Sequence, residues 1–196
     1  MYICGKLIKI MKKILVLIDC QNDFITGSLR NTKAIKAVPK IVKKIREFDG
    51  DAIIYTMDTH GENYLDTKEG KVLDVEHCIK GTEGWQIQGE INSELVGANL
   101  RGIRVFEVQK PTFGAVNLYK DIESVVKNSD GAVDEFDIEF VGFCTDICVV
   151  SNVLLTKAYF YDKANIVVDS TCCAGTSVEN HNSALDVMRS CQIEVV

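Results

Sequence analysis

The sequence predicts an α/β fold, a three-layer α-β-α sandwich around a mainly parallel sheet of about six strands. Short aliphatic runs alternate with segments of helical periodicity along the chain, which is the pattern of successive strand–helix units. The runs are continuous rather than alternating in polarity, as expected of strands buried on both faces of a parallel sheet. A chain of 196 residues is also long enough to bury a full hydrophobic core in one domain.

The expected elements follow one another in a regular order. The run ILVLI at residues 14–18 is the first strand, and an apolar face that includes Val38 and Ile41 predicts a helix over residues 33–48. Residues 59–97 form a long polar connection with six glycines, and a connection of this length is usually functional. The further strands are expected at residues 52–57, 102–108, 136–141, 164–168 and 192–196. The further helices are expected at residues 116–126, 145–159 and 179–190.

The composition excludes several classes of partner. The formal net charge is −6 and the 22 basic residues are scattered, so nucleic acid is not an expected partner. No segment approaches the ~20 consecutive apolar residues of a membrane span. Eight cysteines show neither metal-finger spacing nor an accompanying secretory signal, which predicts reduced thiols in a cytoplasmic protein. Residues 1–11 are interpreted as an N-terminal extension, or as sequence upstream of a start at Met11, and residues 12–196 as a single domain.

Chemically useful residues lie at the expected carboxyl ends of four strands: Asp19, Asp58, Lys110 and the turn that holds Cys148. Open parallel sheets bind their ligands at this edge. Each residue has an ordinary explanation alone, since Asp caps turns, Lys is usually a surface charge and free Cys usually packs. Together they supply what acyl transfer from a carbonyl compound requires. Cys148 is the expected nucleophile, Asp19 the proton acceptor and donor, and Lys110 the cation that holds their charges in place.

The turn that carries this cysteine covers residues 142–150 (GFCTDICVV) and follows an apolar run. Thr145 is the expected N-cap of the helix that follows, which places Cys148 in the first helical turn. The positive end of the helix dipole would favour the thiolate there. A strand, a tight turn and a helix with an early cysteine is an arrangement that displays a nucleophile.

A second group of polar residues follows the second strand. Asp58 and His60 are two positions apart and His77 lies in the long connection, so a carboxylate and two imidazoles can meet and leave coordination positions open. The alternative is that both histidines are ordinary loop residues. His181, near the start of the last helix, has no evident partner and is interpreted as a surface or capping residue.

Five motifs occur in an order that resembles the isochorismatase-like cysteine hydrolases, and among them the nicotinamidase branch. The motifs are IDCQNDF at residues 18–24, DTH at 58–60, HCIKGT at 77–82, KPTF at 110–113 and GFCTDICV at 142–149. The resemblance covers residues 12–196. It implies a catalytic triad, and it implies a divalent metal, usually zinc. The triad would be Asp19, Lys110 and Cys148, and the metal ligands Asp58, His60 and His77.

The resemblance has further implications for the site and the activity. It implies a cis peptide bond between Phe143 and Cys144, and an oxyanion hole formed by the backbone N–H groups of Cys144 and Cys148. The implied activity is hydrolysis of a small amide through a thioester on Cys148, with nicotinamide as the best single substrate. Homo-oligomers, dimers or tetramers, are common in the family and are expected here.

The sequence departs from the nicotinamidase pattern at one position. Members of that branch commonly have a Trp three residues before the second metal histidine, where this chain has Asp74. Phe24 and Phe113 are the remaining candidates for contact with a substrate ring, and both are equally consistent with core packing. Three alternatives stay open: a carbamoyl or ureido amide hydrolase, an isochorismatase-type vinyl-ether hydrolase, which needs no cysteine, and a non-catalytic family member.

Overall fold

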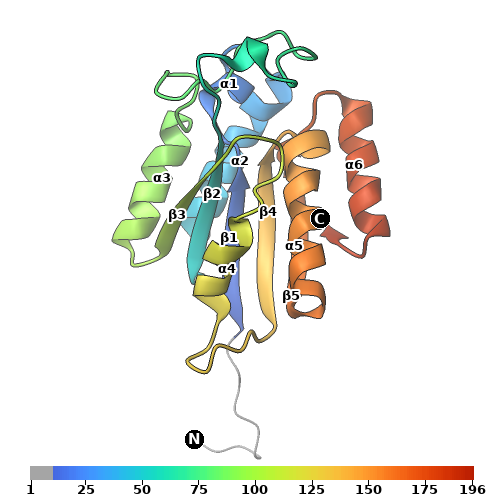
Figure 1. Ribbon diagram of the computed structural model, residues 1–196. Coiled ribbons are helices and arrows are strands. Elements are labelled where there is room, and N and C mark those ends of the chain that lie inside the picture. The colour runs from blue at the N-terminus through green and yellow to red at the C-terminus, as the bar shows by residue number, and fades with distance from the viewer. Residues whose placement is uncertain (1–10) are drawn as a thin grey trace, which may run out of the picture.

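A six-stranded parallel sheet organises the protein. The computed structural model describes residues 11–196, and its strands lie in the order β3-β2-β1-β4-β5-β6 (Figure 1). Residues 1–10, most of the expected N-terminal extension, lie outside this described part. The strands are β1 (Lys12–Ile18), β2 (Ala52–Asp58), β3 (Arg104–Lys110), β4 (Phe136–Phe143), β5 (Ala164–Ala174) and β6 (Glu194–Val195). The predicted α/β fold with a parallel sheet is confirmed.

The centre of the sheet is β1, which pairs with β2 on one side and with β4 on the other. Residues 14–18 of this strand are at most 1% exposed, as the continuous aliphatic run predicts. The chain builds the sheet outward from β1 to β3 and then returns to β4. The carboxyl ends of β1 and β4 therefore meet at the point where the strand order reverses, which is where open α/β sheets bind ligands.

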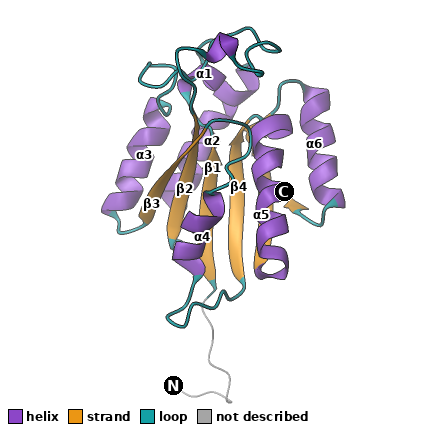
Figure 2. Ribbon diagram, viewed as in Figure 1, coloured by secondary structure: helices purple, strands orange, loops and turns teal. Residues whose placement is uncertain are grey.

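Helices cover both faces of the sheet, as Figure 2 shows, so the molecule has the expected three layers. Leu15 and Leu17 of β1 face a core built with the first three helices, and Ile14, Val16 and Ile18 face a core built with the last three. The first three helices are α1 (Asn22–Ile25), α2 (Thr32–Glu47) and α3 (Gly89–Leu100). The last three helices are α4 (Leu118–Val126), α5 (Val150–Phe160) and α6 (Val178–Ser190).

The connection between β2 and β3 differs from the prediction, because its last part is helix α3. Ile91, Leu95 and Ala98 are buried on one side of this helix, and their spacing is helical. Gly89 and Gly97 lower the helix propensity of the segment and hid this pattern. The polar connection is therefore shorter than residues 59–97.

Strand β5 is longer than predicted. The polar stretch that begins at Asp169 suggested an end after residue 168, but the strand continues through Cys172 and Cys173 to Ala174. These last residues pair with the end of β4, with Cys173 opposite Gly142, after a shift in register. Cys172 and Cys173 are both buried free thiols, as expected of packing residues.

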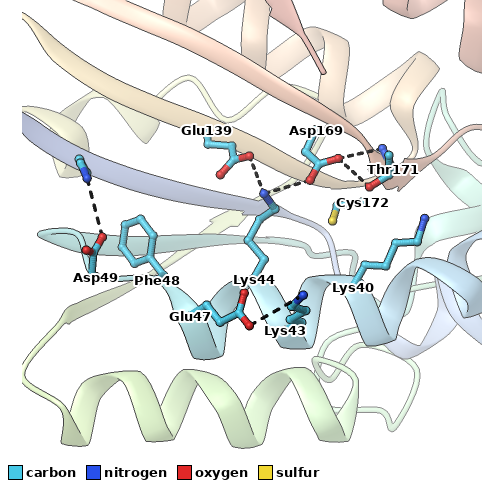
Figure 3. Close-up of a pocket in the computed structure, with 11 residues that line it drawn as sticks. Lys40, Lys43, Lys44, Glu47, Phe48, Asp49, Glu139, Asp169, Thr171 and Cys172 are labelled. Atoms are coloured by element: carbon cyan, nitrogen blue, oxygen red, sulfur yellow. Dashed lines mark hydrogen bonds and ion pairs between the residues drawn. The ribbon is translucent and has the colours of Figure 1, made fainter.

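A half-buried cation links α2 to the sheet through ion pairs. Lys44 lies 2.6 Å from Glu139 of β4 and 2.9 Å from Asp169 of β5. These hydrogen bonds outweigh desolvation and raise the pKa of Lys44. The three side chains line an open groove of ≈ 550 Å³ between α2 and the strands, shown in Figure 3. The groove holds as many carboxylates as lysines, so the ion pairs balance its charge.

Within residues 11–196, no helix combines the length and the apolar character that a membrane crossing requires.

Candidate active site

The candidate residues gather at the carboxyl edge of the sheet. Asp58 and Lys110 are the last residues of β2 and β3 rather than the residues after them, and they lie opposite each other in the register. Asp19 follows β1, and β4 leads into the turn that carries Cys148. The sequence argument from strand ends therefore placed the four residues at one edge correctly.

Lys110 is at the centre of this cluster. Its Nζ lies 2.7 Å from Oδ2 of Asp19, 3.2 Å from Oδ1 of Asp58 and 3.5 Å from Sγ of Cys148. The lysine is 1% exposed, Asp19 is 0% exposed and Cys148 is 4% exposed. An ammonium group this deeply buried is tolerated because two carboxylates face it.

Opposing effects set the protonation of these groups. Burial alone would lower the pKa of Lys110, but the charges of Asp19, Cys148 and Asp58 outweigh it and raise that pKa. Burial raises the pKa of Asp19 above its ordinary value, although Lys110 opposes the shift. Asp58 behaves differently, because hydrogen bonds from two histidines, together with Lys110, outweigh burial and lower its pKa. Asp19 is therefore the carboxyl group better suited to accept a proton.

Cys148 lies in a short π-helical turn, η2 (Thr145–Val149), that precedes α5. The N-terminal flanking residue of this turn is Cys144 rather than the predicted Thr145. Burial and the nearby Asp19 raise the pKa of the Cys148 thiol despite Lys110. The helix start would favour the thiolate, whereas burial and Asp19 act in the opposite direction on the pKa of this thiol. Asp19 and Cys148 both contact the Lys110 ammonium, and Asp19 is the carboxylate available to take the thiol proton during attack.

Backbone geometry at the ends of β1 and β4 brings these groups together. Asp19 has φ of 48°, in the left-handed region, and its carboxylate accepts a hydrogen bond of 2.6 Å from the Thr56 hydroxyl. The peptide bond between Phe143 and Cys144 is cis, as the resemblance implied. Gly142 has φ of 121°, and a Cβ there would lie 2.1 Å from the Ile18 carbonyl oxygen. Only glycine allows β4 to approach β1 this closely at the site.

Next to this cluster lies a group of side chains that could hold a metal ion. One ligand atom from each of Asp58, His60, Glu69 and His77 lies within 4.8 Å of the others. Oδ2 of Asp58 is 3.1 Å from Nε2 of His60 and 3.6 Å from Nε2 of His77. The other ring nitrogen of His77 lies 2.8 Å from the Val75 carbonyl oxygen, which leaves Nε2 facing the group. Two imidazoles and two carboxylates are a donor set that fits a divalent transition metal.

Glu69 is a member of this group that the sequence argument missed. Its Oε1 lies 3.7 Å from Nε2 of His60 and 3.8 Å from Nε2 of His77. The loop that presents it packs through Tyr64, whose buried ring contacts both histidine rings at centroid distances of 4.7 and 4.9 Å. Spacing from the histidines gave no signal for Glu69, because only the folded loop brings it near them.

The aromatic candidates and the position that departs from the family have different environments. Phe24 is buried and its ring meets the edge of His77 at a centroid distance of 5.7 Å. Phe113 is 42% exposed, in the segment that follows Lys110. Asp74 is exposed. Phe24 thus packs against His77, whereas Phe113 is exposed and accessible to a ligand.

His181 does have a partner, which corrects the sequence interpretation. Its Nδ1 lies 2.8 Å from the hydroxyl oxygen of Thr145, the first residue of η2. Thr176, just before α6, also donates its backbone N–H to the Asp146 carboxylate at 2.8 Å. The start of α6 therefore holds the turn that carries Cys148, a contact between segments that sequence spacing does not reveal.

The fold and this site define an α/β protein with a thiol, a carboxylate and a buried lysine at the carboxyl edge of a parallel sheet, and comparison with known proteins identifies the family. The isochorismatase domain family matches residues 13–196, so the chain belongs to the isochorismatase family. Its similarities fall in the nicotinamidase-like branch. The nicotinamidase of Schizosaccharomyces pombe is 24% identical to this chain, in an alignment that covers 93% of this chain and 91% of that protein.

Two solved structures show the same fold. The nicotinamidase of Bacillus subtilis has a TM-score of 0.76 and 26% identity, covering 95% of this chain and 99% of that chain. A pyrazinamidase of Pyrococcus horikoshii, solved in complex with zinc, has a TM-score of 0.74 and 22% identity, covering 94% of this chain and 98% of that chain.

Proposed function

We propose that this protein is a cysteine amidohydrolase that cleaves a small amide, with nicotinamide as the first candidate. The observation that carries the proposal is Lys110, buried between the Asp19 carboxylate and the Cys148 thiol. A nucleophile next to a proton acceptor and a fixed cation is what amide cleavage needs. Similarity to nicotinamidases over more than nine-tenths of the chain supports the choice of substrate.

The proposed reaction has two halves. Asp19 takes the proton of the Cys148 thiol as sulfur adds to the amide carbonyl carbon, and the backbone N–H groups of Cys144 and Cys148 stabilise the oxyanion. Asp19 then gives its proton to the leaving nitrogen, the C–N bond breaks, and ammonia leaves a thioester on Cys148. In the second half Asp19 takes a proton from water, whose oxygen adds to the thioester. The C–S bond breaks, the acid leaves, and the proton returns to the thiol.

We propose that Asp58, His60, His77 and Glu69 hold a divalent metal, with zinc as the first candidate. When bound, the metal would supply a Lewis acid that orients and polarises the substrate. The chain's own contribution is a prepared donor set, in which His77 is oriented through its Nδ1 and Asp58 is held by Lys110. A pyrazinamidase of similar fold was solved with zinc, which agrees with this donor chemistry.

Other parts of the proposal concern the substrate ring and the assembly. Phe113, and to a smaller extent the buried Phe24, are the proposed ring contacts. The proposed partner is a small amide and the proposed location the cytoplasm. A homodimer or homotetramer is proposed because these oligomeric states are common in the family, and light scattering would measure the molar mass in solution.

Measurement of ammonia release tests the function. The panel contains nicotinamide, pyrazinamide, and small carbamoyl and ureido amides, each with and without a chelator and with zinc returned. We expect release from nicotinamide, a loss of roughly a thousandfold or more in C148A, and activity close to wild type in C191A, a matched thiol control. Full activity in folded C148A would refute the thioester scheme. Release from a ureido amide alone would replace nicotinamide as the substrate.

A further inference from the structure

Asn152 is a fully buried polar residue one helical turn after the proposed nucleophile. Its Nδ2 donates to the carbonyl oxygen of Cys148 at 2.8 Å and to that of Phe113 at 3.0 Å. Its Oδ1 accepts from the backbone N–H of Ala115 at 2.8 Å. Both ends of the side-chain amide are used, and they join two segments that are more than thirty residues apart in sequence.

The segment that Asn152 holds connects β3 to α4. It starts at Lys110, whose Nζ contacts Cys148, and it carries Phe113, the proposed ring contact. It also runs close to α5, since a Cβ at Gly114 would lie 2.7 Å from Cδ1 of Leu155. Asn152 therefore joins the turn of the nucleophile to the segment that carries the cation and the ring contact.

A leucine has the same branched skeleton and no polar groups to satisfy, whereas a buried amide is costly unless its groups are paired. Here all the observed bonds go to backbone atoms of the two segments that meet at the reaction centre. We infer that Asn152 is a positioning residue that fixes the Cys148 turn relative to the segment of Lys110 and Phe113. The inference rests on the proposed function, because it takes Cys148 as the nucleophile.

The chemical consequence follows from how steeply rates depend on placement. A displacement of about 1 Å between reacting groups can cost about a hundredfold in rate. In N152D the side chain keeps its shape and the acceptor for Ala115, but the Nδ2 donor becomes an oxygen that faces the carbonyl oxygens of Cys148 and Phe113. Repulsion would separate the two segments. N152S removes the bridge without adding charge.

The experiment compares N152D and N152S with T156V, a near-isosteric change of a buried residue one turn further along α5. All variants are first shown to be folded by circular dichroism, and N152S is the variant used if N152D does not fold. We expect kcat for ammonia release to fall at least about tenfold in either Asn152 variant. We expect the rate of Cys148 alkylation by iodoacetamide, followed by mass spectrometry, to fall about fivefold, because the thiol loses its placement beside Lys110. T156V should stay within about twofold of wild type in both measurements.

A double-mutant cycle with F113A tests the second half of the inference. If Asn152 places Phe113, N152S should raise KM in the wild-type background and leave KM nearly unchanged in F113A. Independent, multiplicative effects on KM would refute the link to Phe113.

A folded Asn152 variant with the kcat and alkylation rate of T156V would show that the residue only packs, and would overturn the inference. The outcome is distinguishable from failure of the proposed function. If wild-type protein releases ammonia from no amide, the function fails, while the alkylation rates, which need no substrate, still decide the role of Asn152.

Discussion

Replacing Lys110 by methionine tests whether the buried cation is the centre of the site. Methionine has a similar length and can occupy the same space, but it leaves Asp19 without its 2.7 Å ion pair and Asp58 without its 3.2 Å ion pair. Removing one partner of a buried ion pair typically costs about 3–5 kcal/mol, because the other charge stays buried and uncompensated. With a urea m-value of about 2–3 kcal/mol/M for a domain of this size, the unfolding midpoint should fall by roughly 1–2 M.

The loss of stability in K110M should depend on pH. Burial raises the pKa of Asp19 and the charge of Lys110 lowers it, so K110M should raise that pKa further. A carboxyl group whose folded pKa lies above its unfolded value of about 3.9 favours the folded state only while it is protonated. That stabilisation is complete below the unfolded value and is lost as pH rises through the folded pKa. The deficit of K110M relative to wild type should therefore be larger at pH 8 than at pH 5.

The assay is urea unfolding followed by circular dichroism at both pH values, with chelator throughout so that no bound cation neutralises Asp58. K43M is the matched control, because Lys43 is exposed on α2 and makes only a 3.9 Å pair with Glu47. The control should change stability by less than about 0.5 kcal/mol. A loss below about 1 kcal/mol in K110M, with the same value at both pH values, would refute this account of the buried cluster.

Three further predictions concern other parts of the molecule. E69Q should weaken zinc binding at least about tenfold in a chelator-competition titration, and an unchanged affinity would remove Glu69 from the metal group. G142A should destabilise by about 3 kcal/mol in urea unfolding, because its Cβ meets the Ile18 carbonyl. G97A, in the interior of α3 where a Cβ meets only an ordinary contact at 3.7 Å, should stabilise by about 0.5–1 kcal/mol, and equal effects of the two substitutions would contradict this comparison. D169N should cost about 1 kcal/mol of stability at pH 7. Hydrogen bonds from Lys44 and Thr171 outweigh burial and lower the pKa of Asp169, so the stabilisation by its carboxylate is lost as pH falls through that pKa. The difference in stability from wild type should therefore shrink towards pH 3, and a difference that grows would refute this account.

The sequence was most informative where chemistry follows directly from strand position. Continuous aliphatic runs predicted a parallel sheet, and the residues next to their carboxyl ends predicted that Asp19, Asp58, Lys110 and Cys148 would meet. The prediction succeeds because the carboxyl ends of parallel strands lie at one edge of the sheet, so residues that follow different strands in the sequence are close in space. The roles of these residues in catalysis stay predictions.

The sequence was least informative where function depends on contacts between loops. Glu69 reaches the histidines only because Tyr64 packs its loop against their rings, and Asn152 finds its partners across the segment after β3. The protonation of Cys148 also depends on burial, which raises the pKa of its thiol and which a local sequence pattern does not report. Such features are determined by three-dimensional packing rather than by spacing along the chain.

The two edges of the sheet differ in a way that matters for engineering. The residues of the candidate site lie at or beyond the carboxyl edge, whereas β1 starts at Lys12 on the opposite edge, together with the turns that precede β2 and β3 (Figure 1). A tag, fusion partner or surface linkage attached at the amino edge would leave the candidate site facing outward. The protein is thus suited to immobilisation in one orientation.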